Sequence, residues 1–271
     1  MLAAMRLSSK LFVRTENCMK YPICNALSAN AAKHCAALVV TENFEVGTRT
    51  LSKLAQPKET LRNGTLTFVS SKGRTFGITC KHVVQHYRDL TAASDKSAYS
   101  MRTMLNGFYV VMDRFKTPQP QYGDGPLDIA VREVMPEFIA KLGKEPFDLD
   151  ACPDLPSQIR HGYAVGFPET LKRRVQSDPL GYKVSMPQLE VLAELRHTPT
   201  RRFQLVSEIG EPPKHSDFSG MSGGPIFWST ETEYGMLGIT YEGDVGSDGR
   251  SIHIFGEFAA RDTILDWIDQ L

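Results

Sequence analysis

Several features that would place a sequence in a special class are missing from this one. The 271-residue chain contains no run of 18 or more apolar residues, so it predicts no membrane-spanning helix. The formal net charge is zero, from 31 basic and 31 acidic side chains, and bulk charge therefore favours no nucleic-acid or polyanionic partner. The chain is long enough for a large core in one or two domains.

Cysteine is scarce and shows no paired arrangement. The five cysteines are odd in number and three of them lie in the first 35 residues, so no disulfide framework is visible. We therefore expect reduced thiols and a cytoplasmic location. A zinc site from Cys18, Cys24, Cys35 and His34 is an alternative, but these spacings resemble no structural zinc pattern. We expect no metal and no organic cofactor.

Residues 1–57 differ in texture from the rest and predict an N-terminal extension that is partly helical or disordered. Within it, the alanine-rich residues 26–37 predict a helix, and residues 37–46 predict a first strand. We expect the folded domain to span residues 58–271.

The first 18 residues leave two readings open. Arg6, Lys10 and Arg14 lie at helical spacing, no acidic residue precedes position 16, and the continuous apolar core of a secretory signal is missing. This pattern fits a solvated amphipathic helix. It also fits a mitochondrial presequence, which would make the location mitochondrial instead of cytoplasmic.

From residue 64 onward the chain consists of short strand-like segments separated by glycine, proline and polar residues. Residues 64–79 predict a strand, a turn and a strand, and a short helix is predicted at 81–87. Further strands are predicted at 107–112, 127–134, 162–167, 181–184, 189–195, 203–206, 225–228, 236–241 and 251–255. Short strands in such number indicate an all-β antiparallel sandwich or barrel fold.

Two other segments complete the predicted organisation. Residues 135–156 are rich in proline and acids and predict the crossing between two halves of the domain. The last eleven residues, 261–271, place Ile264, Trp267 and Ile268 at helical spacing. They predict a C-terminal amphipathic helix packed on the body.

The most informative stretch is Phe218–Phe227, FSGMSGGPIF, in which a serine stands among glycines just before an apolar strand. A serine hydroxyl is a poor nucleophile at neutral pH, so it needs a base beside it and donors for the oxyanion that it creates. Glycines allow a substrate carbonyl to approach backbone N–H groups closely. On this interpretation the N–H groups of Gly220 and Ser222 form an oxyanion hole. Taken alone, the stretch is equally well a glycine-rich turn that opens a strand.

A histidine and a carboxylate that would complete such a site occur upstream. His82 stands in ITCKHVV, where a strand passes into a short helix, and Asp128 stands in PLDIAV at the head of an apolar strand. Each alone is more simply a structural residue. Asp124 competes with Asp128, but it lies in a glycine turn without an apolar strand behind it.

Together these motifs resemble the trypsin/chymotrypsin-like serine protease family. The resemblance lies in Thr-Xxx-Xxx-His-Val-Val, Asp-Ile-Ala-Val and Gly-Xxx-Ser-Gly-Gly-Pro, in that order, and it extends from about residue 64 to the end of the chain. The His-Val-Val run resembles intracellular-type bacterial or Deg-like members, and we expect no PDZ domain. The family fold implies two six-stranded antiparallel Greek-key barrels, one at about 58–135 and one at about 156–260, with the active site between them.

The resemblance implies a serine endopeptidase that acts on a polypeptide substrate. Ser222 would form the acyl-enzyme, His82 would act as general base and acid, and Asp128 would orient His82. The alternative is a catalytically silent binding module of the same fold. An α/β-hydrolase is disfavoured, because that fold places the acid and the histidine after the serine and shows βαβ alternation.

By resemblance, six residues line the substrate pocket: Ser216, Asp217, Phe218, Thr240, Glu242 and Gly243. An acid at Asp217 would favour a basic residue before the scissile bond, unless it is simply a surface acid in a loop. Met221 occupies the position where secreted members carry an acid that pairs with a freshly cut N-terminus. The site is therefore expected to be preformed or ordered by something else.

Two other patterns in the sequence bear on ligand binding. His82 and His86 form HVVQH, but the zinc-protease pattern needs Glu where Val83 stands. The basic clusters 172–174 and 196–202 lack interleaved aromatic residues, so they predict solvated hairpin tips and no nucleic-acid partner. The oligomeric state is not readable from the sequence.

Overall fold

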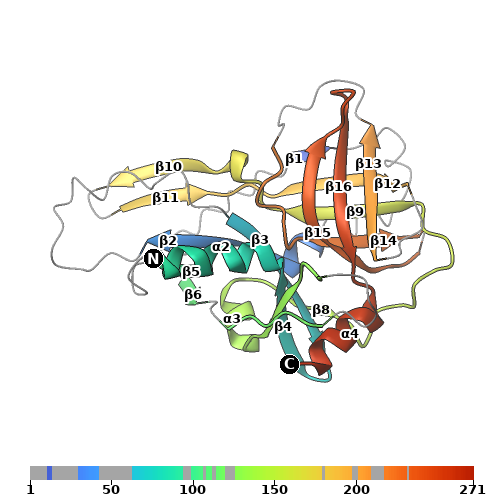
Figure 1. Ribbon diagram of the computed structural model, residues 1–271, viewed down its shortest axis with the longest axis horizontal. Coiled ribbons are helices and arrows are strands. Elements are labelled where there is room, and N and C mark those ends of the chain that lie inside the picture. Colours follow the sequence, from blue (N-terminus) through green and yellow to red (C-terminus); the bar gives the residue numbers. More distant parts are fainter. Residues whose placement is uncertain are drawn as a thin grey trace, which may run out of the picture.

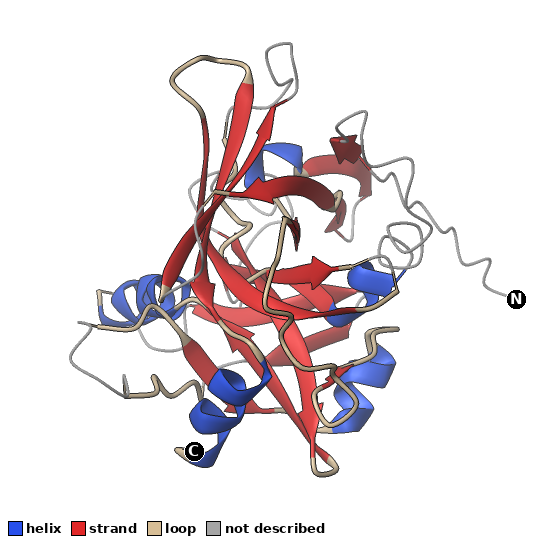
Figure 2. Ribbon diagram, turned by 90° about the vertical axis from the view of Figure 1, so that its right-hand side faces the viewer, coloured by secondary structure: helices blue, strands red, loops and turns tan. Residues whose placement is uncertain are grey.

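A computed structural model describes residues 11–13, 30–42, 63–93, 99–105, 108–111, 114–119, 126–178, 181–196, 201–208, 217–230 and 232–271. Most of these residues lie in strands, and the helices lie around the outside of the strands (Figures 1 and 2). None of the described helices is long and apolar enough to cross a membrane. The predicted all-β class with a C-terminal helix is therefore confirmed at this level.

The second half of the chain forms a closed six-stranded antiparallel barrel. Its strands follow the order β12-β13-β16-β15-β14-β9, and β9 pairs back with β12 from Leu189↔Gly166 to Glu194↔His161. The strands are β9 (His161–Gly166), β12 (Leu189–Leu195), β13 (Arg202–Glu208), β14 (Pro225–Ser229), β15 (Tyr234–Val245) and β16 (Ser251–Phe258). Closure removes the exposed edges of the sheet, because every strand then has two partners.

Alternating buried and more exposed side chains show which side of these strands faces the core. In β13 the side chains of Phe203, Leu205 and Ser207 are buried, and the residues between them are more exposed. This is the period of two that a strand with one core-facing side requires. The short strand β1 (Leu11–Val13) pairs in parallel with β12, and β10 (Arg173–Asp178) and β11 (Gly181–Ser185) form a separate hairpin that extends from the barrel in Figure 1.

One irregularity of the barrel bears on the site. The pairing of β15 with β16 runs Thr240↔Gly256 and then Glu242↔Phe255, so Tyr241 is the extra residue of a β-bulge. A bulged residue is left outside the ladder and its backbone groups are free to point elsewhere.

The first half of the chain forms a second sheet in the order β6-β5-β2-β3-β4-β7, with β8 paired to β3. The strands are β2 (Cys35–Glu42), β3 (Asn63–Ser71), β4 (Arg74–Thr79), β5 (Tyr99–Leu105), β6 (Phe108–Val111), β7 (Ala130–Glu133) and β8 (Phe147–Asp148). Among the described residues no pairing closes this sheet into a barrel. The first of the two predicted barrels therefore stays a prediction.

Residues 35–42 belong to the predicted extension, but they form β2 between β3 and β5. The first sheet thus begins well before residue 58. Asn30 and Ala31 are helical and the 3₁₀-helix η2 (Ala32–His34) follows, so the predicted helix at 26–37 gives way to strand at Cys35. The rest of residues 1–57, apart from β1, lies outside the described residues.

The helices occupy the ends of the sheets. The predicted short helix after β4 is α2 (Lys81–Ala92), and the crossing between the halves contains α3 (Pro136–Lys141) and β8. A 3₁₀-helix, η4 (Glu169–Leu171), follows β9. The predicted terminal helix is α4 (Arg261–Asp269), which buries Ile264, Trp267 and Ile268.

The last helix joins the two halves. It follows the second barrel in sequence but lies near β4 and β8 of the first sheet in Figure 1. Its apolar face belongs to the same buried cluster as Phe76 and Ile78 of β4. The amide oxygen of Gln270 accepts a hydrogen bond from the Gln119 N–H at 2.7 Å. The C-terminus thus holds the second half against the first.

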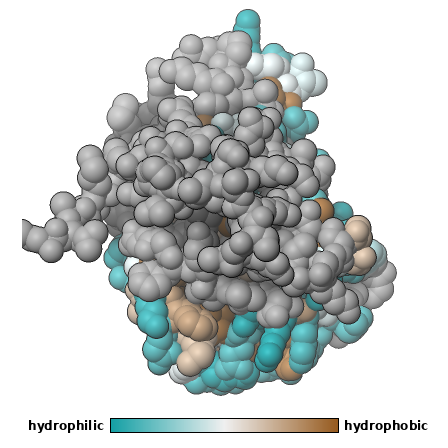
Figure 3. Space-filling model, turned by 90° about the vertical axis from the view of Figure 1, so that its left-hand side faces the viewer, coloured by the Kyte–Doolittle hydropathy of each residue, from teal (hydrophilic) through white to brown (hydrophobic). Residues whose placement is uncertain are grey.

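The described surface is mostly polar. Among the described residues, the large apolar side chains with substantial exposure are Met135 at 58% and Leu155 at 39%. The part of the molecule that is coloured in Figure 3 shows hydrophilic side chains around smaller apolar areas. Isolated exposed apolar residues of this kind are normal for a soluble surface and indicate no partner by themselves.

A buried histidine makes folding pH-dependent. His34 packs edge-on against Phe147, with ring centroids 5.4 Å apart, and its Nδ1–H donates to the Glu145 carbonyl at 2.9 Å. Burial lowers the pKa of His34 below its ordinary value of 6.5. The unfolded chain therefore takes up this proton first as the pH falls, and the stability that neutral His34 contributes above pH 6.5 is lost below it.

We predict that His34→Asn makes the protein less acid-sensitive. Asn keeps a donor near Nδ1 but does not titrate, so between pH 6.5 and 5 the free energy of unfolding should fall less steeply than in the wild type. The difference is at most about 1.4 kcal/mol per pH unit. Urea unfolding at several pH values measures it, and identical slopes for both proteins would contradict the assignment.

Candidate active site

His82 lies in the first turn of α2, directly after β4. Cys80 is the extended residue before the helix, and Val83 and Val84 bury the inner face of the first turn. This leaves the His82 side chain on the outer face, 49% exposed. The buried valines fix the rotation of α2 about its axis, and this rotation fixes the position of the His82 imidazole at the surface.

Asp128 holds His82 at two points. One carboxylate oxygen accepts the His82 backbone N–H at 2.9 Å, and the other accepts the ring Nδ1–H at 2.7 Å. The Asp128 side chain is 21% exposed. An anion at the start of a helix is favourable, since the first N–H groups of a helix have no partner within it. The pairing fixes the ring orientation and leaves Nε2 as the second ring nitrogen. Asp124, the competing carboxylate, lies outside the described residues.

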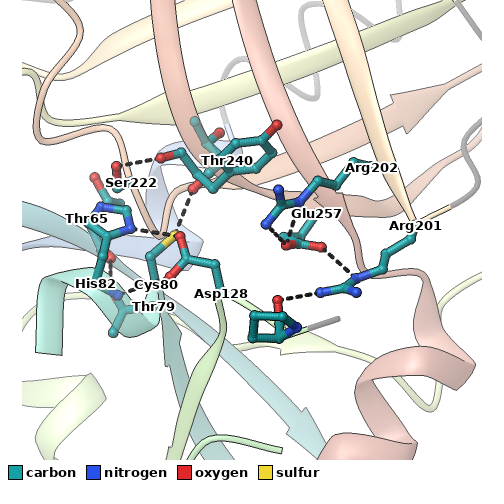
Figure 4. A network of polar contacts seen from close by, with 12 residues as sticks. Thr65, Thr79, Cys80, His82, Asp128, Arg201, Arg202, Ser222, Thr240 and Glu257 are labelled. Atoms are coloured by element: carbon teal, nitrogen blue, oxygen red, sulfur yellow. Dashed lines mark hydrogen bonds and ion pairs between the residues drawn. The ribbon is translucent and has the colours of Figure 1, made fainter. Parts of the chain in front are cut away.

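Ser222 lies in the loop before β14, and this loop meets the start of α2 at Gly64. A Cβ atom on Gly64 would lie 2.8 Å from Val83 Cγ1 and 3.2 Å from the Ser222 carbonyl oxygen. The structure thus brings the segments of His82 and Ser222 together, as Figure 4 shows.

The Ser222 hydroxyl donates to the Tyr241 carbonyl at 2.9 Å (Figure 4). Among the described residues no hydrogen bond joins it to the His82 ring. The carbonyl that it meets belongs to the bulged residue of β15, whose backbone the bulge turns away from the ladder.

Two backbone N–H groups of residues 219–224 have no hydrogen-bond acceptor among the described residues, although all the other backbone groups there are paired. Every carbonyl from Ser219 to Gly224 accepts a hydrogen bond. Three carbonyls accept from side chains or the backbone of β3: Gly220 from the Thr65 hydroxyl (2.8 Å), Ser222 from the Thr65 N–H (2.8 Å) and Gly223 from the Thr67 hydroxyl (2.7 Å). The other three accept from backbone N–H groups: Ser219 from Glu169 (2.6 Å), Met221 from Gly224 (2.8 Å) and Gly224 from Thr240 (2.8 Å). The N–H groups of Ser219, Met221, Gly223 and Gly224 all donate. Within the described parts of the chain, the N–H groups of Gly220 and Ser222 alone in this loop have no acceptor.

This arrangement depends on two glycines in the left-handed region. Gly220 has φ +96°, and a Cβ there would lie 2.6 Å from the Phe167 carbonyl oxygen. Gly223 has φ +93°, and a Cβ there would lie 2.0 Å from the Thr65 carbonyl oxygen. Any side chain at either position would therefore displace the loop.

The predicted pocket residues fall into different environments. Asp217 is exposed and its carboxylate accepts the Ser219 N–H at 2.7 Å. Phe218 is buried and contacts Gly243, where a Cβ would lie 2.8 Å from Phe218 Cβ. Thr240 is buried beside the loop, Glu242 is exposed on the bulge, and Ser216 lies outside the described residues.

A buried carboxylate next to the site was not predicted. Glu257 of β16 is fully buried and pairs with Arg202 at 2.9 Å and with Arg201 at 3.5 Å. The two arginines were predicted to lie in a solvated hairpin tip, and the structure instead places them on this carboxylate. An acid within the apolar strand IHIFGEF was the one clue in the sequence to a buried ion pair.

The two arginines connect Glu257 to the surroundings of the site (Figure 4). Arg202 lies over the Tyr241 ring, with its guanidinium carbon 4.7 Å from the ring centroid. Arg201 donates to the carbonyl of Pro126, two residues before Asp128, at 2.6 Å. Through these arginines the buried Glu257 carboxylate is connected to Tyr241, whose carbonyl accepts from Ser222. It is also connected to the segment that carries Asp128.

Three ligand atoms gather at the His82–Asp128 pair. The Cys80 thiol, the His82 ring and the Asp128 carboxylate lie within 4.8 Å of one another, so these residues could hold a metal ion. Metal binding would need the Cys80 thiolate, whereas burial raises the pKa of that thiol well above its ordinary value. The Cys80 thiol donates to the Thr240 carbonyl at 3.1 Å, and Nδ1 of His82 is engaged by Asp128.

No family model and no curated protein sequence matches this chain. Among solved structures, it is similar to a thermostable serine protease, AL20, from an extremophilic microorganism, at 10% identity over 89% of this chain and 98% of that one, with a TM-score of 0.49. It is also similar to a structure from a study of the Sesbania mosaic virus VPg protein, at 13% identity over 84% and 86%, with a TM-score of 0.39. Likenesses this distant decide neither the fold nor the activity of this chain.

We predict that Arg202→Met destabilises the protein by about 2–3 kcal/mol. Removing one partner of a buried charge typically costs about 3–5 kcal/mol, and Arg201 remains to offset part of this. The matched control is Arg196→Met, which breaks the exposed 2.8 Å pair with Glu208. The control should cost less than about 1 kcal/mol. Chemical denaturation measures both, and equal losses would contradict the role of Glu257.

Proposed function

We propose that the protein is a serine endopeptidase in which Ser222 is the nucleophile, His82 the general base and acid, and Asp128 the residue that orients His82. The observation that carries the proposal is the pair of N–H groups of Gly220 and Ser222, which have no acceptor among the described residues. The other N–H groups and all the carbonyls of residues 219–224 are paired. Buried or partly buried backbone N–H groups rarely lack a partner. Two of them beside a serine hydroxyl are what a developing oxyanion needs.

The proposed reaction begins with a rotation of the Ser222 hydroxyl from the Tyr241 carbonyl to Nε2 of His82. His82 takes the proton as Ser222 Oγ attacks the peptide carbonyl, and the resulting oxyanion accepts hydrogen bonds from Gly220 and Ser222. His82 then gives its proton to the leaving amine as the C–N bond breaks. His82 next deprotonates a water molecule, which attacks the acyl-enzyme. The ester C–O bond then breaks, His82 returns the proton to Ser222 Oγ, and the carboxylic acid is released. Asp128 stabilises the imidazolium in both steps.

The contact between Ser222 and Tyr241 favours a second candidate, a catalytically silent binding module of the same fold. In that protein the 2.9 Å hydrogen bond from Ser222 to the Tyr241 carbonyl would be permanent and the hydroxyl would never meet His82. The paired His82–Asp128 arrangement and the two free donors support the enzyme instead, because a binding module has no use for them together.

We expect Ser222→Ala to abolish both peptide cleavage and covalent labelling by a fluorophosphonate, because both reactions need the Ser222 oxygen as nucleophile. Circular dichroism should show an unchanged fold. Ser219→Ala, three residues away on the exposed side of the same loop, is the control and should be labelled like the wild type. Labelling of Ser222→Ala would refute the assignment, and a wild type that is never labelled would favour the silent module.

Asp128→Asn should lower kcat by about 10⁴-fold with little loss of stability. The Asn carbonyl can still accept the His82 N–H, but its NH₂ group then faces Nδ1. The ring proton therefore moves to Nε2, which can no longer act as a base. Steady-state kinetics on a peptide substrate measures the effect, with Asp89→Asn on the outer face of α2 as a control. Retention of more than a tenth of the activity would contradict the role of Asp128.

A further inference from the structure

The loop that carries Ser222 has Met221 at the position where secreted members of the resembled family carry an acid. Met221 is fully buried in an apolar cluster that joins side chains of the second barrel with Phe218 of the loop and Leu171 of η4. Something else must therefore hold the N–H groups of Gly220 and Ser222 in place. A loop with two residues at positive φ has alternative conformations available to it, since glycine populates both halves of φ space.

We propose that Thr65 of β3 is the positioning residue that holds this loop in its donor conformation, so that the chain needs no cleavage to become active. The proposal rests on the function proposed above. Thr65 belongs to the first sheet, whereas the N–H groups of Gly220 and Ser222 that it positions belong to the second half of the chain.

Thr65 contacts the loop through its backbone and its side chain. Its N–H donates to the Ser222 carbonyl at 2.8 Å, and its hydroxyl donates to the Gly220 carbonyl at 2.8 Å. These two carbonyls belong to the peptide groups on either side of the one that carries the Ser222 N–H. Because both neighbours are held, the loop cannot shift as a whole, and turning this one peptide group would break the hydrogen bond from the Gly224 N–H to the Met221 carbonyl.

The direction of the Thr65 hydroxyl is itself fixed. Its oxygen accepts the Phe167 N–H at 3.1 Å, so its proton is left for the Gly220 carbonyl. The Thr65 carbonyl accepts the Thr79 hydroxyl at 2.8 Å, and the Thr65 side chain is fully buried. A hydroxyl with one donor and one acceptor in a dry site has a single favourable orientation. Thr65 thus transmits the position of the first sheet to the loop.

The remaining carbonyls of the loop explain why the donors point outward. The Ser219 carbonyl, which shares a peptide group with the Gly220 N–H, accepts from Glu169 N–H at 2.6 Å. The Met221 carbonyl, which shares a peptide group with the Ser222 N–H, accepts from Gly224 N–H at 2.8 Å. In a trans peptide the N–H points away from the C=O, so both donors are directed away from these partners. A reversed peptide would instead present a carbonyl oxygen, which repels an oxyanion.

The test compares Thr65→Val with Thr65→Ser. Valine keeps the shape of the side chain and the backbone hydrogen bond but loses the hydroxyl. We therefore expect kcat to fall about 10- to 100-fold, a loss no larger than that caused by removing one oxyanion donor. KM should change less than about threefold, since the ground state uses the donors weakly. Binding of a peptide boronic acid, which mimics the tetrahedral intermediate, should weaken by the same factor as kcat. Thr65→Ser should restore kcat to within about threefold of the wild type.

The matched control is Thr75→Val, which removes another buried hydroxyl that donates to a backbone carbonyl, that of Val134, in the same sheet. It should lower stability without changing kcat per folded molecule. If Thr65→Val keeps full kcat, or if its loss is matched by Thr75→Val, the proposal is overturned.

A second measurement does not depend on whether Thr65→Val folds. Intact mass spectrometry of the fluorophosphonate-treated wild type should show the label on the uncleaved chain, with no activity gained on limited proteolysis. Labelling that appears only after cleavage would overturn the proposal while leaving the proposed function standing. A wild type that neither cleaves peptides nor takes the label would instead remove the proposed function, and this inference with it.

Discussion

The seam between the start of β3 and the loop from Asp217 to Gly224 is the constraint on which the rest of this structure depends. Thr65 and Thr67 lie in the first sheet, and they hold the carbonyls of Gly220, Ser222 and Gly223 from the second half of the chain. The His82 segment follows β4, which pairs with β3, so the same seam also fixes where His82 lies. Docking of the two halves and assembly of the site are therefore one event.

A second connection between the halves runs through charge. Glu257 is enclosed by the second barrel and could be tolerated there only with partners, because an unpaired buried carboxylate is costly. Its partners Arg201 and Arg202 reach the Pro126 carbonyl and the Tyr241 ring. The ion pair thus costs desolvation but ties the Asp128 segment to the second barrel, and α4 ties the C-terminus to the first sheet from the other side.

Much of the architecture was predictable because local patterns decided it. Short strand-like segments between glycine, proline and polar breaks predicted the strands of the second barrel, and the helical spacing of apolar residues predicted α4. Both agree with the structure to within a few residues. Strand β2 was placed in an extension because its partners β3 and β5 lie far along the chain and its sequence carries no mark of them. Arg201 and Arg202 were placed in a solvated turn because their partner Glu257 lies 55 residues or more away.

The sequence by itself determined the chemical groups and their order: a histidine at a strand-to-helix junction, an aspartate at the head of an apolar strand, and a serine among glycines that admit positive φ. Only the tertiary structure decided how these groups meet. It pairs His82 with Asp128, turns the Ser222 hydroxyl to the bulged Tyr241, and leaves the N–H groups of Gly220 and Ser222 without an acceptor in the described chain. The physical reason is that each of these outcomes depends on hydrogen bonds between residues remote in sequence, whose geometry is set by sheet register and docking.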